Sequence, residues 1–238
     1  MRRKIASRIC MALAFIIMGV SSESCTTSIR KNVGLVSPED AILADDQYRT
    51  PKAKTLAVAY RPQLLRLAEH IYGCRPLRLV KNGIGFRQPK GAETDDRYLS
   101  VWVTIDQTDG SFASMPREQR VSAMFSRYGL DLLRRMTAMA GAASDTNVMG
   151  FSVVLGWAKP GMPPNKPATE TLALFVDKLS LIDFLGKRLS PTEFVGRAKF
   201  LVFDGKEPII PVKLEIWQET FNSTCNVKSD GKQEKQGV

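Results

Sequence analysis

The chain has 238 residues, 44% of them hydrophobic, and a formal net charge of +10 at neutral pH. This length and composition suffice to bury one sizeable core, which argues against a disordered chain and favours a single domain. The positive charge bears on solubility and on association with anionic partners, and it does not indicate a fold.

The first 24 residues have the layout of a secretory signal. Four basic residues precede an apolar run at residues 9–20, and small polar residues follow it. A helix of this length rises about 18 Å, short of the roughly 30 Å hydrocarbon core of a bilayer, which disfavours an uncleaved anchor. We therefore expect export and removal of residues 1–24. Because these hold four basic residues and one acid, their loss lowers the formal charge from +10 to +7.

Cys25 follows the signal directly, in the stretch SCTTS at 24–28. A small residue before a cysteine just beyond an apolar run resembles the processing site of bacterial lipoproteins, where the thiol is acylated before the cut. The resemblance implies that Cys25 becomes the lipidated first residue and holds the chain to a membrane. Ordinary signal cleavage after Ser22 or Ser24 is the alternative. The polar residues 25–50 lack sustained periodicity, which predicts a tether ahead of the domain.

Three cysteines remain once the signal is removed: Cys25, Cys74 and Cys225. An odd number in an exported chain indicates a free, modified or intermolecular thiol. If Cys25 carries lipid, Cys74 and Cys225 make a natural pair in an oxidising compartment, and we expect a disulfide between them. Two unrelated thiols are the alternative. No Cys or His spacing indicates a zinc site, and no cofactor is expected.

The first predicted elements are two helices and two strands. Serine before proline and two acids at 37–40 indicates a short helix, and a firmer helix at 62–72 is ended by the glycine that follows. A strand at 77–86 is interrupted by Asn82-Gly83. Residues 97–106 alternate apolar and polar side chains, which predicts a strand with one buried and one partly covered face.

The longest helix is predicted at 116–140, where a stripe of apolar residues should lie on the sheet. Gly129 interrupts it and marks a bend or a close approach. Apolar runs at 150–157 and 171–177 then predict two further strands.

The C-terminal part is predicted to hold two short helices, at about 180–189 and 191–196. Two strands should flank an Asp204-Gly205 turn, with Val212, Leu214 and Ile216 alternating along the second. The whole pattern predicts an α+β domain: a mainly antiparallel sheet of about five to six strands packed against one long helix and one shorter helix. This domain would span 51–225, ahead of a disordered tail at 226–238.

Catalytic constellations are hard to find in this sequence. The single histidine, His70, lies on the polar side of its predicted helix, which favours a solvated or surface-paired side chain, and no G-x-S-x-G motif accompanies it. Asp109-Gly110 directly after a strand indicates a turn and lacks the ligand spacing of a calcium loop. No catalytic or metal-binding residue is assigned. A hydrolase that uses two carboxylates from distant parts of the chain is the enzymatic alternative.

Basic residues gather in two places. The segment 61–90 has seven basic residues and one acid, and three arginines recur every seven residues in the long helix, which would place them on one face. The residues that can contact a polyanion are Arg75, Arg78, Lys81, Arg120, Arg127 and Arg134. A solvated face that binds nothing is the alternative.

These features predict a non-catalytic exported envelope protein, a membrane-tethered module for binding or assembly. Its expected partners are the membrane through lipid on Cys25, another envelope protein, or an anionic glycan; nucleic acid is not expected. The location would be the bacterial cell envelope, lipid-anchored or free in the periplasm. The alternatives are an exported hydrolase and a binder of anionic envelope glycans.

Overall fold

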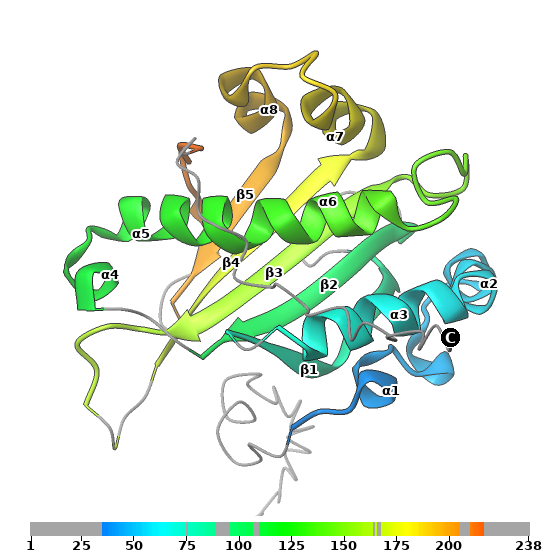
Figure 1. Cartoon of the computed structure of the whole chain (residues 1–238), viewed down its shortest axis with the longest axis horizontal. Helices are drawn as coiled ribbons and strands as arrows, with labels where there is room; N and C mark the ends of the chain where they lie inside the picture. Colours follow the sequence, from blue (N-terminus) through cyan, green and yellow to red (C-terminus); the bar gives the residue numbers. More distant parts are fainter. Residues whose placement is uncertain are drawn as a thin grey trace, which may run out of the picture.

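A computed structural model describes residues 35–74, 76–88, 96–106, 110–163, 165, 168–204 and 210–216. One sheet forms its centre, and helices gather on the side that faces the viewer in Figure 1. The strands, in both chain order and sheet order, are β1 (Leu77–Arg87), β2 (Tyr98–Ile105), β3 (Gly150–Ala158), β4 (Thr169–Asp177), β5 (Lys199–Phe203) and β6 (Ile210–Pro211). The expected α+β class is confirmed.

The sheet is mixed, which differs from the expected mainly antiparallel arrangement at one pairing. β2 and β3 run parallel from Tyr98 beside Gly150 to Ile105 beside Trp157, whereas the other neighbours are antiparallel. The physical reason is the connection between them, because a parallel pair needs a crossover that returns the chain to the same end of the sheet. Helices α4 (Gly110–Ser114), α5 (Arg117–Met124) and α6 (Leu130–Ala138) make up that crossover.

A π-helical turn, η2 (Phe125–Gly129), joins α5 to α6 within the run predicted as one helix. A Cβ atom on Gly129 would lie 2.6 Å from the Phe125 ring, so the glycine leaves room for that ring. Gly129, which the sequence indicated as a bend or a close approach, therefore lies in a widened helical turn. There the backbone packs closely against the Phe125 ring of the same helix. Buried residues of α5, η2 and α6 belong to the same apolar core as the inward residues of the strands, and the helical run crosses the sheet in Figure 1.

The N-terminal part of the described chain consists of α1 (Pro38–Ala41), η1 (Asp45–Gln47), α2 (Pro51–Ala59) and α3 (Arg61–Tyr72). Ser37 caps α1 by accepting a hydrogen bond from the Asp40 amide at 3.1 Å, as its sequence indicates. Ala41 is fully buried, and Ile42 pairs in parallel with Ile84 of β1. The expected tether at 25–50 is therefore too long, because its end packs on the domain.

β1 carries the irregularity that Asn82-Gly83 predicted, but the strand continues through it. The register with β2 shifts between Leu79 and Ile84, and Asn82 has a φ of 55°. A Cβ atom on Gly83 would lie 2.7 Å from the carbonyl oxygens of Trp102 and Val80. The pair thus forms a bulge in which the backbone approaches its neighbour too closely for a side chain.

The two short C-terminal helices are confirmed as α7 (Lys178–Leu185) and α8 (Pro191–Arg197). α8 begins with a capping box in which the Glu193 amide donates to Ser190 and the Glu193 carboxylate accepts from the Ser190 amide.

The strand expected through Val212, Leu214 and Ile216 is wrong. Its residues follow the two-residue β6 without forming a strand, although Leu214 is buried. The Glu215 amide donates to the Ser122 hydroxyl of α5 at 3.1 Å. The segment after β6 therefore does not continue the sheet, because it packs against α5.

The predictions for residues 1–34 and 217–238 concern parts of the chain outside the described residues. They include the signal, the site at Cys25, the position of Cys225 and the tail. No helix in the described ranges is long and apolar enough to cross a membrane.

Candidate functional site

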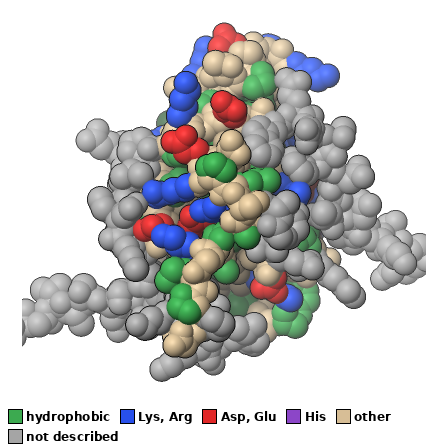
Figure 2. All heavy atoms as spheres, turned by 90° about the vertical axis from the view of Figure 1, so that its left-hand side faces the viewer, with side chains coloured by type: hydrophobic (Ala, Val, Ile, Leu, Met, Phe, Trp, Pro, Cys, Tyr) green, Lys and Arg blue, Asp and Glu red, His purple; other side chains and the backbone are tan. Residues whose placement is uncertain are grey.

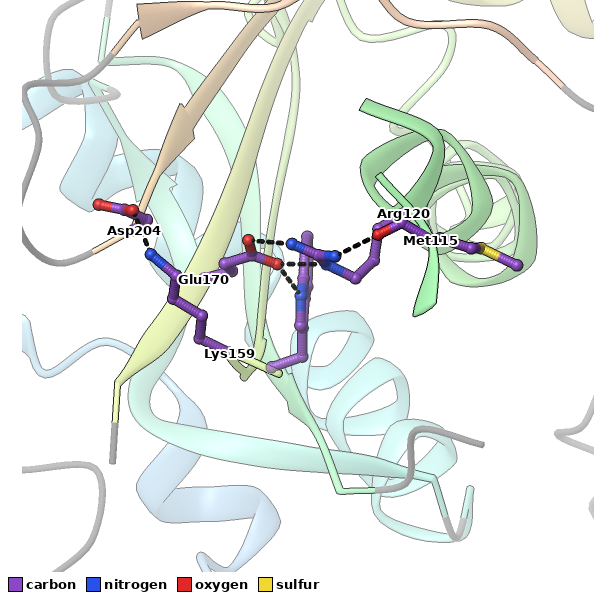
Figure 3. Close-up of polar contacts among 6 residues, drawn as sticks. Met115, Arg120, Lys159, Glu170 and Asp204 are labelled. Atoms are coloured by element: carbon purple, nitrogen blue, oxygen red, sulfur yellow. Dashed lines mark hydrogen bonds and ion pairs between the residues drawn. The ribbon is translucent and has the colours of Figure 1, made fainter. Parts of the chain in front are cut away.

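Two deeply buried charged side chains lie at one end of the sheet, where β3 ends and β4 begins (Figure 3). Glu170 of β4 is 1% exposed and Arg120 of α5 is 8% exposed. Arg120 donates through Nε to Oε2 of Glu170 at 2.7 Å and through Nη2 to Oε1 at 2.5 Å. The Trp157 indole, also buried, donates to Oε2 at 2.7 Å, and Arg120 Nη1 donates to the Met115 carbonyl oxygen at 2.6 Å. We call these four residues the Glu170 network.

The Glu170 network joins α5 to the β3–β4 pair. A bidentate pair between a guanidinium and a carboxylate is among the stronger polar contacts in proteins, and both oxygens of Glu170 are engaged. A general acid or base must exchange a proton with a substrate, whereas the Glu170 carboxylate is enclosed and accepts hydrogen bonds from three N–H groups. The geometry is that of a structural connection. The burial of Glu170 follows from the alternation of side chains along its strand, because Glu170, Leu172 and Leu174 all lie on the inward face.

A second ion pair lies at the same end of the sheet. Lys159, just after β3, contacts Oδ2 of Asp204, just after β5, at 2.5 Å. The Asp204 side chain is 7% exposed and the Lys159 side chain 29%. Lys and Arg side chains lie among Asp and Glu side chains on the end that Figure 2 shows, without a large area of one sign. The two buried acids here each have a cation, which does not favour a hydrolytic carboxylate pair.

The basic residues named as polyanion contacts differ in their exposure and in their partners. Arg78 pairs with Asp106 at 2.5 Å, Lys81 and Arg134 are exposed, Arg127 is partly buried, and Arg75 lies outside the described residues. Arg120 is a correction, since its guanidinium is buried against Glu170. The spacing of seven residues failed because the π-helical turn widens the helix and rotates the residues after it relative to those before it.

An open groove lies between α3 and the end of α6, with a volume of about 380 Å³. Its lining consists of Gln63, Arg66, Leu67, His70, Arg135, Ala138, Met139 and Ala140. The α3 members fall at intervals of three and four residues, so they share one side of that helix. The spacing of the α3 residues can be seen in the sequence, whereas the α6 residues that face them across the groove cannot.

His70 lines this groove and is less solvated than its helical position predicted. Its Nε2 atom is buried and has no hydrogen-bond partner among the described residues, and the same holds for Oε1 of Gln63. Burial lowers the pKa of His70 below its usual value, the nearby Arg135 lowers it further, and Asp131 opposes them. His70 is therefore held towards its neutral form, and its stabilising contribution is present at neutral pH and lost as the pH falls below about 6.5.

Cys74 is fully buried just after α3, and it is disulfide-bonded. The other cysteines lie outside the described residues, so the pairing with Cys225 stays a prediction.

Proteolysis of the unreduced protein is expected to release peptides of Cys74 and Cys225 joined to each other, which reduction separates. A loop of about 150 residues allows up to about 5 kcal/mol of stabilisation in chain-entropy models. Because Cys74 is buried, free thiols must be alkylated in denaturant before digestion. Alkylated Cys225, or Cys74 joined to Cys25, would contradict the pairing.

Within the described ranges, no group of three or more His, Cys, Asp or Glu side chains is arranged to hold a metal ion. Comparisons with protein-family models, curated proteins and solved structures gave no match for this chain. The function must be argued from the chain's own chemistry.

Proposed function

We propose that the chain is a non-catalytic exported protein, held at a membrane by lipid on Cys25, whose α+β domain binds a partner or helps to organise an assembly in the cell envelope. Its sequence supports the location, because a signal layout is followed by a cysteine at a lipoprotein-like position. The observation that favours binding over hydrolysis is the engagement of Glu170. This enclosed carboxylate accepts three hydrogen bonds from Arg120 and Trp157.

The finer organisation belongs to the same proposal. A tether of polar residues after Cys25 gives the domain reach from the membrane surface, and it ends before α1 because Ala41 is buried in the core. Two or three acyl chains on one residue give durable anchoring, since each buried CH₂ group contributes about 0.8 kcal/mol and a single chain holds only marginally.

Replacing Cys25 by serine is expected to release the protein from the membrane fraction or to leave the precursor uncut, because serine has no thiol to acylate. Intact-mass analysis of the detergent-extracted native protein should show an acylated N-terminus at Cys25. The matched control is Cys10→Ser, which removes a cysteine within the signal and should leave the membrane association unchanged. A mature chain that begins at Glu23 or Cys25 without added lipid mass would refute the anchor.

A further inference from the structure

The groove between α3 and α6 brings together positive charge from two helices. α3 contributes Arg66 and, once it is protonated, His70, and α6 contributes Arg135. Both helices lie on the viewer's side of the sheet in Figure 1. Arg135 donates through Nε to Asp131 at 2.7 Å, an ion pair within one helix that leaves the two terminal nitrogens of the guanidinium uncommitted within the described ranges. The groove thus holds two guanidiniums and an imidazole, and the Asp131 carboxylate pairs with one of the guanidiniums.

Two polar atoms of the groove lack the partners that buried polar atoms normally have. Nε2 of His70 and Oε1 of Gln63 are both buried, and neither makes a hydrogen bond within the part of the chain that the structure describes. Such atoms in a native structure call for an explanation, of which a bound ligand is one. Both side chains line the same groove, so rotation of each about its side-chain bonds would bring its unpartnered atom to one ligand there.

The remaining lining is apolar. Leu67 is buried, and Met139 and the two alanines after Thr137 border the charged part. A pocket with a mostly apolar wall and a few convergent polar groups is the usual form of a small-ligand site. The C-terminal end of α6 disfavours an anion, but its partial charge is smaller than that of either guanidinium.

We propose that this groove binds a phosphate group. Arg66 and Arg135 supply donors from opposite sides, which suits an oxyanion with several acceptor oxygens better than a single carboxylate plane. His70 donates through Nε2 when protonated, and Gln63 accepts from a protonated phosphate oxygen. The phosphate can belong to a soluble phosphate compound or to a lipid headgroup whose apolar part lies against Leu67 and Met139. The site needs only α3 and α6, so its failure would leave export and the anchor at Cys25 untouched.

Phosphate binding and protonation of His70 must be coupled. An anion in the groove stabilises the imidazolium, so bound phosphate raises the pKa that burial and Arg135 hold down. By linkage, the protein with a protonated His70 binds phosphate more tightly than the protein with a neutral His70. Each unit by which phosphate raises the pKa of His70 corresponds to a tenfold ratio between these two affinities. For a phosphate group of constant charge, binding should therefore strengthen as the pH falls through the pKa of His70.

The test is an NMR titration of the histidine ring. His70 is the only histidine, so in the full chain without a histidine tag its ring signals report this site alone. Inorganic phosphate, compared with chloride at equal ionic strength, should raise the pKa of His70 by about half a unit or more, a threefold or larger affinity ratio. Arg66→Gln and Arg135→Gln should each remove most of this phosphate-dependent rise.

Arg188→Gln is the matched control, because Arg188 is an exposed arginine paired with an aspartate elsewhere on the protein. It should keep the full rise. A pKa that phosphate does not change would overturn the proposal, and so would a rise that persists in both groove variants.

A second arm separates the two sources of phosphate. Dihexanoyl phosphatidic acid, a water-soluble short-chain lipid, should bind at least tenfold more tightly than inorganic phosphate if the natural ligand is a headgroup, and Met139→Ser should remove that advantage. Equal binding of the two assigns a soluble phosphate compound. Binding of neither overturns the proposal.

Discussion

Replacing Arg120 by methionine is expected to lower the free energy of unfolding by about 3–5 kcal/mol. The change leaves Glu170, which is 1% exposed, without its cation, and the Trp157 indole alone cannot compensate a buried negative charge. Methionine has a similar length and an apolar side chain, so the loss of volume is small. Urea denaturation at neutral pH, followed by circular dichroism, measures the effect.

Two further variants identify the cause. In the double variant Arg120→Met with Glu170→Gln no charge stays buried in the Glu170 network, and the glutamine oxygen can still accept from Trp157, so most of the stability should return. Arg188→Met removes an exposed pair in which the arginine side chain is 61% exposed, and it should cost no more than about 1 kcal/mol. Equal losses for Arg120→Met and Arg188→Met would show that the Glu170 network contributes nothing beyond a surface contact.

Replacing Phe194 by alanine is expected to cost about 3–5 kcal/mol, because it opens a cavity in the core. Phe194 of α8 is fully buried and stacks on Phe184 of α7, with ring centroids 4.1 Å apart and planes at 22°. It also lies 6.5 Å from the Phe125 ring of η2, which in turn meets Phe200 of β5 edge-on at 5.2 Å. The ring thus connects both C-terminal helices to the π-helical turn.

The size of the loss should follow the volume removed. Phe194→Leu keeps most of the apolar volume and should cost clearly less than Phe194→Ala. Leu179→Ala, on the 69% exposed side chain of α7, should change the stability by less than about 0.5 kcal/mol. If Phe194→Ala were as mild as Leu179→Ala, the aromatic cluster would not hold α8 in place.

Helix α2 was not predicted from the sequence pattern. Its nine residues were not predicted as a helix, because an exposed apolar residue, Val58, and the small alanines make the apolar stripe weak, yet Thr50 caps it by accepting from the Ala53 amide at 3.2 Å. Ala53, Leu56 and Ala57 are buried against the core. These positions follow helical spacing, and packing against the core stabilises a helix that the weak stripe by itself only suggests.

The residues by themselves determined the local structure: the cap at Ser37, the alternation along 98–105, the short helices after residue 177 and the irregularity at Asn82-Gly83. Caps, turns and alternation act over a few residues, so a short window contains their cause. Only the tertiary structure decided that Arg120 meets Glu170, fifty residues further along, and that His70 shares a groove with Arg135. Those contacts depend on the crossover between β2 and β3 and on the rotation at the π-helical turn, which no short window contains.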